Sequence, residues 1–475
     1  MHKFLVLILI FSSLALPSAA QSGRVNAAQP SDSIPDLQAP TPKEMFEEAN
    51  AYSKKKFDEF KQKKLPYSDA LYRQTLQEQK QLAARYAATL LTRQNLAGED
   101  FYYLGMLHWL ALNFEGTQET LRKFFETKNA SAENLQTARS VMAVMAARRK
   151  NFDEAEKFLS DYLKHQPVNL RERFKMESEL AENYRAARDF AKAAAHAEES
   201  YRAAKASLQE IGASRARALA EILEAAMSLH EIYKDGGDGK NAEATLSNLQ
   251  KIAASADSTP IYYYAVDHLI RFFVETDRKP AALEFYRASL NQTKKDFSNK
   301  ALQDDVLRRL KGREKHYELL GETAPEITGI DQWFPAAGAK TLADLRGKIV
   351  LLDFWATWCG PCIGAFPKLT EWHETFQKDG FVVLGLTRYY NAVAGTKADQ
   401  KTEADFVARM KQTHRIPYDF VLAKDALNHH NYGADGIPTA VLIDRKGVIR
   451  YIDSGTSTGR EEELRKMIEK LLAEK

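Results

Sequence analysis

Two cysteines three positions apart constrain the C-terminal part of this chain more than any other feature. They are the only cysteines among 475 residues, and they form the segment Cys359-Gly360-Pro361-Cys362. The apolar run 348–355 before them predicts a buried strand, and the segment 360–377 after them predicts a helix. Proline is tolerated in the first turn of a helix, because its missing N–H would have no partner there. The pair is therefore expected between a buried strand and a helix N-terminus.

This placement predicts redox chemistry at the pair. Free N–H groups and the helix dipole favour a thiolate at a helix N-terminus, so Cys359 is the predicted attacking nucleophile. Cys362, one turn further into the helix, is predicted to attack the resulting mixed disulfide and release the product. A structural disulfide closing so short a loop would stabilise little, and zinc would need two more ligands at suitable spacing. We expect a redox-active disulfide, with neither a metal nor another cofactor.

Asp353 is the third predicted catalytic residue. It lies six residues before Cys359, within an otherwise apolar run. A carboxyl group in a buried strand is costly to desolvate and should have a raised pKa. Such a group can accept or return the proton of Cys362 as a general base. A paired structural acid, or a cap at the strand end, is the alternative that the sequence leaves open.

The C-terminal third, from about Gly321 to the end, resembles the TlpA/ResA-like branch of the thioredoxin superfamily. The motifs that carry the resemblance are Gly321-Glu-Thr-Ala324-Pro325, Leu345-Arg-Gly347-Lys348, the segment from Trp355 to Cys362, the segment from Tyr432 to Thr439, and Ile443-Asp444. The resemblance implies a thioredoxin fold and thiol–disulfide exchange with partner proteins. It also implies a cis peptide at Ile437-Pro438 beside the cysteines, with the Ile437 backbone pairing with an incoming client segment.

Two tryptophans flank the predicted site. Trp355 is expected to pack in the core, whereas Trp358, next to Cys359, is expected to shape the surface that contacts the client. The two adjacent histidines at 429–430 suggest metal binding only weakly, because adjacent side chains point to different faces of most elements and no ligand cluster supports them.

One departure from the related family concerns proton transfer. The family usually places a Glu three residues after the second cysteine and an Asn on the strand before the motif, where this chain has Ala365 and Asp353. An acid on the strand is the arrangement of thioredoxin itself. A peroxidase of the related peroxiredoxin group would need a Pro seven residues, and a Thr or Ser three residues, before the attacking cysteine. Those positions hold Leu352 and Ala356, so the peroxide-activating residues are missing.

Secondary structure predicted for the C-terminal third alternates between strands and helices. Strands are predicted at 348–355, 381–386, 418–422, 439–444 and 448–452, and helices at 360–377, 403–414 and 461–473. Strand–helix–strand order followed by a hairpin and a helix predicts a mixed central sheet with helices on both faces.

Residues 43–318 are predicted to form an all-α domain of helical repeats. Apolar residues recur at helical spacing, and three Phe residues, each predicted to begin the second helix of a pair, are spaced by 38: Phe114, Phe152 and Phe190. This pattern resembles the tetratricopeptide repeat. Two further pairs, at 218–254 and 261–290, fit it only loosely, and an irregular helical bundle is the alternative. A solenoid presents a concave surface, so a protein or peptide partner is expected on the repeats.

The N-terminal residues predict export. Lys3 precedes an apolar run at 4–16 and small residues at 18–20, which is the layout of a signal peptide over 1–20. Residues 21–42 are rich in Pro and predict a flexible linker. The predicted architecture is therefore a multidomain chain: a signal peptide, a linker, an all-α solenoid at 43–318 and an α/β thioredoxin-like domain at 319–475. We expect the mature protein to be periplasmic, or otherwise extracytoplasmic.

Expected partners follow from the residues and from the resemblance. A net charge of +3 gives no reason to expect nucleic acid. The Gly-Pro pair between the cysteines matches thioredoxin, which is reducing, so client proteins with disulfides, such as apocytochromes in cytochrome c maturation, are the expected substrates. With no third cysteine, another protein must recharge the pair, and the resemblance suggests a membrane thiol reductase of the DsbD type. The alternative is a protein-binding scaffold whose repeats recruit a partner, with the thioredoxin domain acting as a redox sensor or holdase.

Overall fold

The computed structural model describes residues 39–66, 68–212, 214–335, 341–393 and 396–474. The predicted signal peptide and most of the predicted linker lie outside these ranges. The chain forms two compact units, residues 1–221 and 222–475, which are described one at a time. The second unit thus combines the last helices of the predicted solenoid with the whole of the predicted thioredoxin-like domain.

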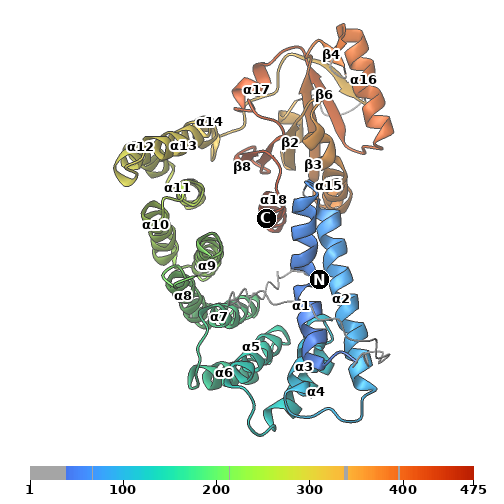
Figure 1. Ribbon diagram of the computed structural model, residues 1–475. Helices are drawn as coiled ribbons and strands as arrows, with labels where there is room; N and C mark the ends of the chain where they lie inside the picture. The colour runs from blue at the N-terminus through green and yellow to red at the C-terminus, as the bar shows by residue number, and fades with distance from the viewer. Residues whose placement is uncertain (1–38, 67, 213, 336–340, 394–395, 475) are drawn as a thin grey trace, which may run out of the picture. The chain divides into compact units, whose positions relative to one another are not determined.

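Helices alone make up the described part of the first unit (Figure 1). They are α1 (Pro42–Gln62), α2 (Asp69–Leu91), α3 (Asp100–Leu110), α4 (Phe114–Phe125), α5 (Ala132–Arg148), α6 (Phe152–Leu163), α7 (Leu170–Ala186) and α8 (Phe190–Ser207). The next helix, α9 (Arg215–Asp235), contains the boundary between the units. The three Phe residues that the sequence placed at helix starts begin α4, α6 and α8, which confirms those starts.

The turns before α4, α6 and α8 share one construction. In each turn, a residue with φ near 60° precedes an Asn or Asp whose side chain accepts the backbone N–H three residues further on. The residues with positive φ are Leu112, Lys150 and Arg188, and the caps are Asn113, Asn151 and Asp189. A side-chain cap satisfies one of the N–H groups left free at a helix start. The 38-residue spacing therefore corresponds to a repeated turn, while the tetratricopeptide assignment itself remains a prediction.

The second unit continues with helices before its sheet begins. These are α10 (Gly239–Ser255), α11 (Thr259–Glu275), α12 (Lys279–Asp296), α13 (Lys300–Lys311) and α14 (Glu314–Leu319). The turns before α10 and α12 repeat the positive φ, at Gly237 and Asp277, but only the first is followed by a side-chain cap, Asp238. This partial match agrees with the looser sequence pattern of these two helix pairs.

A mixed six-stranded sheet forms the core of the C-terminal domain, with strand order β1-β6-β3-β2-β7-β8. The strands are β1 (Ile330–Phe334), β2 (Ile349–Phe354), β3 (Phe381–Arg388), β6 (Asp419–Ala423), β7 (Thr439–Ile443) and β8 (Ile449–Ser454). Strand β3 pairs in parallel with β2 and β6, and the other pairs are antiparallel. A small hairpin, β4 (Ala392–Val393) and β5 (Thr396–Lys397), lies outside this sheet.

Helices cover both faces of the sheet, as the sequence predicted. They are α15 (Gly360–Phe376), α16 (Gln400–Thr413), α17 (Leu427–Asn431) and α18 (Thr458–Ala473), with short 3-10 turns at Ala343–Leu345 and Gln377–Asp379. Alternate residues of β2 point to opposite faces. Ile349 and Leu351 share one core with α15, α16 and α18, while Val350 and Leu352 share the other with residues at the end of α14.

The sequence did not predict β1 or α17. Strand β1 is an edge strand that pairs only with β6, and its sequence, Ile-Asp-Gln-Trp-Phe, does not alternate cleanly. Its pairing partner, rather than its own pattern, fixes it as a strand. Within the described ranges, none of the helices has an apolar stretch long enough to cross a membrane.

Candidate active site at the start of helix α15

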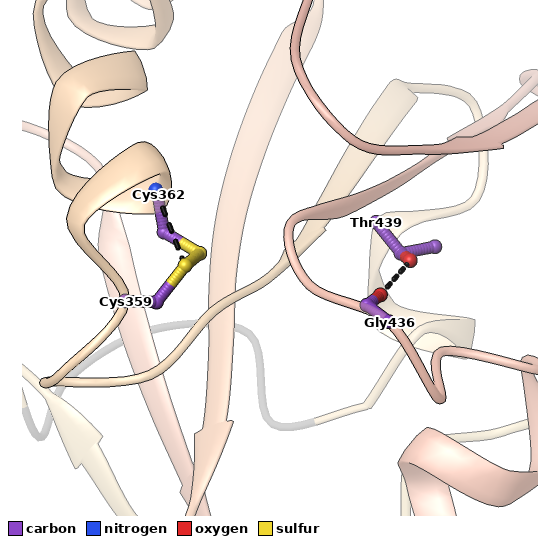
Figure 2. The surroundings of a disulfide bond; sticks show 4 residues. All are labelled: Cys359, Cys362, Gly436 and Thr439. Atoms are coloured by element: carbon purple, nitrogen blue, oxygen red, sulfur yellow. Dashed lines mark hydrogen bonds between the residues drawn. A yellow bond between two sulfur atoms is a disulfide. The ribbon is translucent and has the colours of Figure 1, made fainter.

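Cys359 and Cys362 form a disulfide at the start of α15 (Figure 2). Cys359 is the N-cap residue, and its Sγ accepts the backbone N–H of Cys362 at 3.2 Å. Gly360 and Pro361 are the first two residues of the helix and are exposed. Cys359 keeps 5% of its surface exposed, and Cys362 keeps none. A partner can therefore reach the pair only through Cys359.

The segment before β7 packs beside this disulfide. Ile437 contacts the core that includes both cysteines, and the Ile437–Pro438 peptide is cis, as the resemblance implied. Two hydrogen bonds fix the end of the segment: Thr439 Oγ1 donates to the Gly436 carbonyl at 2.5 Å (Figure 2), and the Gly455 N–H donates to the Pro438 carbonyl at 2.7 Å. These bonds fix the backbone around Pro438, while pairing of the Ile437 backbone with a client stays a prediction.

Asp353 lies in β2 on the same side of the sheet as the disulfide. Its neighbours two residues away, Leu351 and Trp355, belong to the core that contains both cysteines. The side chain is 3% exposed, and its Oδ2 has no hydrogen-bond partner among the described residues. Burial raises the pKa of Asp353 to about 7, and the positive charge of Arg460 opposes that rise. A carboxyl group with this pKa can exchange a proton near neutral pH.

Tyr418 is a second buried polar group in this core. It is 1% exposed, and its hydroxyl has no hydrogen-bond partner among the described residues. Burial raises the pKa of Tyr418 well above its usual value, and the negative charge of Asp353 raises it further. The phenol is therefore neutral whenever Asp353 titrates. The sequence analysis missed this residue because Tyr418 fits an ordinary buried strand pattern.

Gly385 makes room for the packing around Asp353. It lies opposite Asp353 in the parallel pair of β2 and β3. A Cβ atom there would come within 2.7 Å of the Phe420 ring and 3.1 Å of Trp355 Nε1. Trp355 is fully buried, with ring centroids 4.6 Å from Phe420 and 5.3 Å from Phe366, which confirms its predicted role in core packing.

Trp358 and Tyr390 form an aromatic surface next to Cys359. Trp358 is 54% exposed, and its ring meets the Tyr390 ring edge to face at 5.4 Å. The Arg388 guanidinium lies 4.1 Å from the centroid of Tyr390. The buried Glu403 carboxylate accepts the backbone N–H groups of Tyr390 and Asn391, which fixes the loop after β3. The sequence analysis missed Tyr390, although a Tyr-Tyr pair directly after a buried strand was a visible signal.

The remaining positions that the sequence singled out lie around this site. Ala365 is partly buried in α15, and Leu352 is buried in the core on the opposite face of the sheet. His429 is buried, with its ring 5.1 Å from Phe354, and burial lowers its pKa to about 4, whereas His430 is exposed. Among the described residues, no three His, Cys, Asp or Glu side chains lie close enough together to hold a metal ion.

Comparisons with known proteins agree with this geometry. Residues 320–452 match the model of the AhpC/TSA family. The thiol-disulfide oxidoreductase ResA of Geobacillus kaustophilus (strain HTA426) is 32% identical over 145 residues, which cover 30% of this chain and 75% of ResA. This chain belongs to the thioredoxin-fold family of thiol-disulfide oxidoreductases. The family match leaves the helices before residue 320 outside.

Two further comparisons cover the same share of the chain. Protein DipZ of Mycobacterium tuberculosis (strain CDC 1551 / Oshkosh) is 34% identical over 136 residues, 28% of this chain, but this chain spans only 18% of the length of DipZ. The crystal structure of a thiol-disulfide isomerase from Corynebacterium glutamicum is 20% identical, with a TM-score of 0.27, and the match covers 32% of this chain and 98% of that chain.

Proposed function

We propose that this protein is an extracytoplasmic thiol–disulfide oxidoreductase that reduces or isomerises disulfides of client proteins through Cys359 and Cys362. The observation that carries the proposal is a cysteine pair at a helix N-terminus, with a buried acid on the same face of the sheet. The predicted signal peptide supports export. The restriction of cysteine to one adjacent pair supports a chemical rather than a structural role.

The proposed exchange takes place in two steps, and in each step one sulfur–sulfur bond forms as another breaks. The Cys359 thiolate attacks one sulfur of a client disulfide, a Cys359–client bond forms, and the other client sulfur leaves as a thiolate. The Cys362 thiolate then attacks Cys359 Sγ, which forms the Cys359–Cys362 disulfide and releases the second client thiolate. The client gains two electrons, and the cysteine pair loses two. A second protein must then reduce the pair, and a membrane thiol reductase of the DsbD type is the proposed donor.

Asp353 acts on the second step in this proposal. The Cys362 thiol must lose its proton before it can attack, and it is buried away from water. Asp353 lies on the same side of the sheet and has a pKa of about 7, so its ionised form can accept that proton at neutral pH. The absence of a hydrogen-bond partner for Oδ2 within the described chain favours this role over that of a paired structural acid.

Client contact is assigned to two surfaces beside Cys359. Trp358 offers an exposed aromatic ring. The backbone of Ile437, before Pro438, is the proposed pairing site for an extended client segment, and its side chain packs against the core that holds both cysteines. The helical repeats are the proposed site for a protein or peptide partner. Apocytochromes of cytochrome c maturation are one client class that fits a reducing enzyme outside the cytoplasm.

Trapping of the mixed disulfide tests the proposed function. Cys362→Ala removes the resolving thiol, so a complex between Cys359 and its client should accumulate and should dissolve on addition of dithiothreitol. Cys359→Ala is the matched control and should trap nothing. If Cys362→Ala also traps nothing from an oxidised extracytoplasmic extract, and fails to form a mixed disulfide with an oxidised model protein, the exchange function is wrong and the scaffold alternative gains support.

A further inference from the structure

One row across the sheet links the buried acid of the site to the edge strand β8. Asp353 in β2 lies directly opposite Ala440 in β7, and Ala440 lies directly opposite Asp453 in β8. Residues directly opposite in antiparallel strands point to the same face. Asp353 and Asp453 therefore share the face of the disulfide, about 10 Å apart as two strand spacings, and Ala440 is the residue between them in the row.

Arg460 extends over this row from helix α18. Three residues of α18, Leu464, Ile468 and Leu471, pack on this face against Ile349 and Leu351. Arg460 precedes them by four, eight and eleven residues. Positions at this spacing share one side of a helix. Arg460 therefore faces the sheet at the end of β2 that carries Asp353.

Asp453 holds the Arg460 side chain by two contacts. Arg460 Nε lies 3.5 Å from Asp453 Oδ2, and Arg460 Nη2 donates to the Asp453 backbone carbonyl. The backbone N–H of Arg460 is itself bound to the capping hydroxyl of Ser457 at 3.2 Å. Arg460 is thus held at its backbone by Ser457 and at its guanidinium by Asp453.

The helices before the sheet in turn hold Asp453. Arg313 donates from Nη1 to Asp453 Oδ1 at 2.6 Å and from Nη2 to the Ile452 carbonyl at 3.0 Å. Arg271 of α11 lies 3.5 Å from Asp453 Oδ2. Both arginines also pair with the buried Asp267, at 3.4 Å and 2.8 Å respectively. A continuous set of ion pairs therefore runs from α11 to Arg460.

We propose that Arg460, fixed by Asp453, is a positioning residue that controls when Asp353 takes up and returns its proton during exchange. Its positive charge stabilises the ionised carboxylate and so favours the state that can accept the Cys362 proton. The inference rests on the proposed function, because it assigns to Asp353 the base role described there.

The other titratable groups on this face are neutral or paired, so the charge of Arg460 has the main electrostatic effect on the pKa of Asp353. Tyr418 and Tyr451 are neutral at neutral pH, because burial raises the pKa of Tyr418 far above its usual value and that of Tyr451 to about 12. Asp453 is neutralised by its arginines, and the two cysteines are joined as a disulfide in the oxidised state. On the same face, Lys411 of α16 is engaged by the Ile416 and Tyr418 carbonyls, and the positive charge of Arg460 lowers the pKa of Asp353 against the effect of burial.

The test follows the titration of the Asp353 carboxyl carbon by NMR in the full oxidised chain, together with the pH profile of the second exchange step. The wild-type midpoint should lie near the pKa of about 7. Arg460→Gln should raise the midpoint by about one pH unit, the effect of a unit charge at about 10 Å in an effective dielectric constant of about 20. One pH unit below its new midpoint, only about a tenth of Asp353 would be ionised.

Matched variants separate the effect of the Arg460 charge from a general effect on folding. Arg460→Lys keeps the charge and should restore most of the wild-type midpoint. Arg465→Gln removes a half-exposed arginine from the same helix and should leave the midpoint unchanged. Wild-type titration in a folded Arg460→Gln protein would overturn the inference. If Arg460→Gln does not fold, the Arg460→Lys protein provides the test. A midpoint about one pH unit above the wild-type value in that variant would overturn the inference.

The base role of Asp353 is tested apart from the role of Arg460. If Asp353→Asn leaves the second exchange step unchanged at every pH, the base assignment fails, and the inference about Arg460 fails with it. If Asp353→Asn slows that step but Arg460→Gln does not move the titration, only the positioning role is wrong.

Discussion

Two buried aspartates, one in helix α11 and one in strand β2, have pKa values shifted in opposite directions. Asp267 and Asp353 are 4% and 3% exposed. Burial alone would raise the pKa of Asp267, but the charges of Arg271 and Arg313 hold it well below its usual value. Burial raises the pKa of Asp353 to about 7, and the charge of Arg460 opposes the rise. The cations close to a buried acid thus decide whether its pKa lies below or above the usual value.

Removal of the attacking thiol is expected to have the largest effect on the chemistry. Cys359→Ser should reduce disulfide exchange to the uncatalysed rate, because no other cysteine is exposed and Cys362 is fully buried. The measurement is the reduction of a small aromatic disulfide followed by absorbance. Asn151→Ala, in the helical region, is the control and should keep the wild-type rate. Residual turnover in Cys359→Ser would place the chemistry elsewhere.

Asp267→Asn should destabilise the second unit strongly. The substitution removes the carboxylate that pairs with Arg271 and Arg313 and accepts the Tyr317 hydroxyl at 2.8 Å. Breaking a buried pair from one side costs about 3–5 kcal/mol. Because the folded pKa of Asp267 is lowered, its stabilising effect is present above the unfolded pKa and is lost as the pH falls. Urea unfolding at pH 7 should show the loss, and equal stability of variant and wild type would contradict it.

Asp353→Asn should stabilise the protein at neutral pH, whereas Asp267→Asn destabilises it. The folded pKa of about 7 exceeds the ordinary aspartate pKa of 3.8, so the folded state binds the proton more tightly than the unfolded state. The contribution of Asp353 to stability is therefore greatest below pH 4 and is lost as the pH rises from about 4 through 7, by roughly 3–5 kcal/mol in total. The variant lacks this loss and should exceed the wild type by that amount at pH 8, while differing little at pH 4. Parallel stability curves for the two proteins would show that Asp353 is not a strained acid.

A helix cap in the repeats should matter least. Asn151→Ala removes the side chain that accepts the Glu154 N–H at the start of α6, and such caps contribute about 1 kcal/mol. Urea unfolding of the first unit should register a loss of this size. Asn113→Ala and Asp189→Ala should match it, since the three turns share one construction. Unequal losses would mean that the repeated turns are not equivalent.

The features that local sequence patterns encode could be predicted from the sequence. The strand–cysteine–helix order, the buried Asp353, the sheet with helices on both faces and the starts of α4, α6 and α8 follow from periodicity and spacing. Strand β1 and Arg460 do not, because each depends on a partner distant in the sequence. Arg460, for example, lies 107 residues after Asp353. The register of β2, β7 and β8 aligns Asp353 with Asp453, and Asp453 in turn binds Arg460.

The reduction potential of the Cys359–Cys362 couple tests the central claim most directly, because it decides whether the pair can reduce client disulfides. It is measured by equilibration of the purified full chain with glutathione or dithiothreitol buffers and quantification of the free thiols. The account predicts a value near the −270 mV or so of thioredoxin. A value near −120 mV, typical of a strong oxidant such as DsbA, would contradict it.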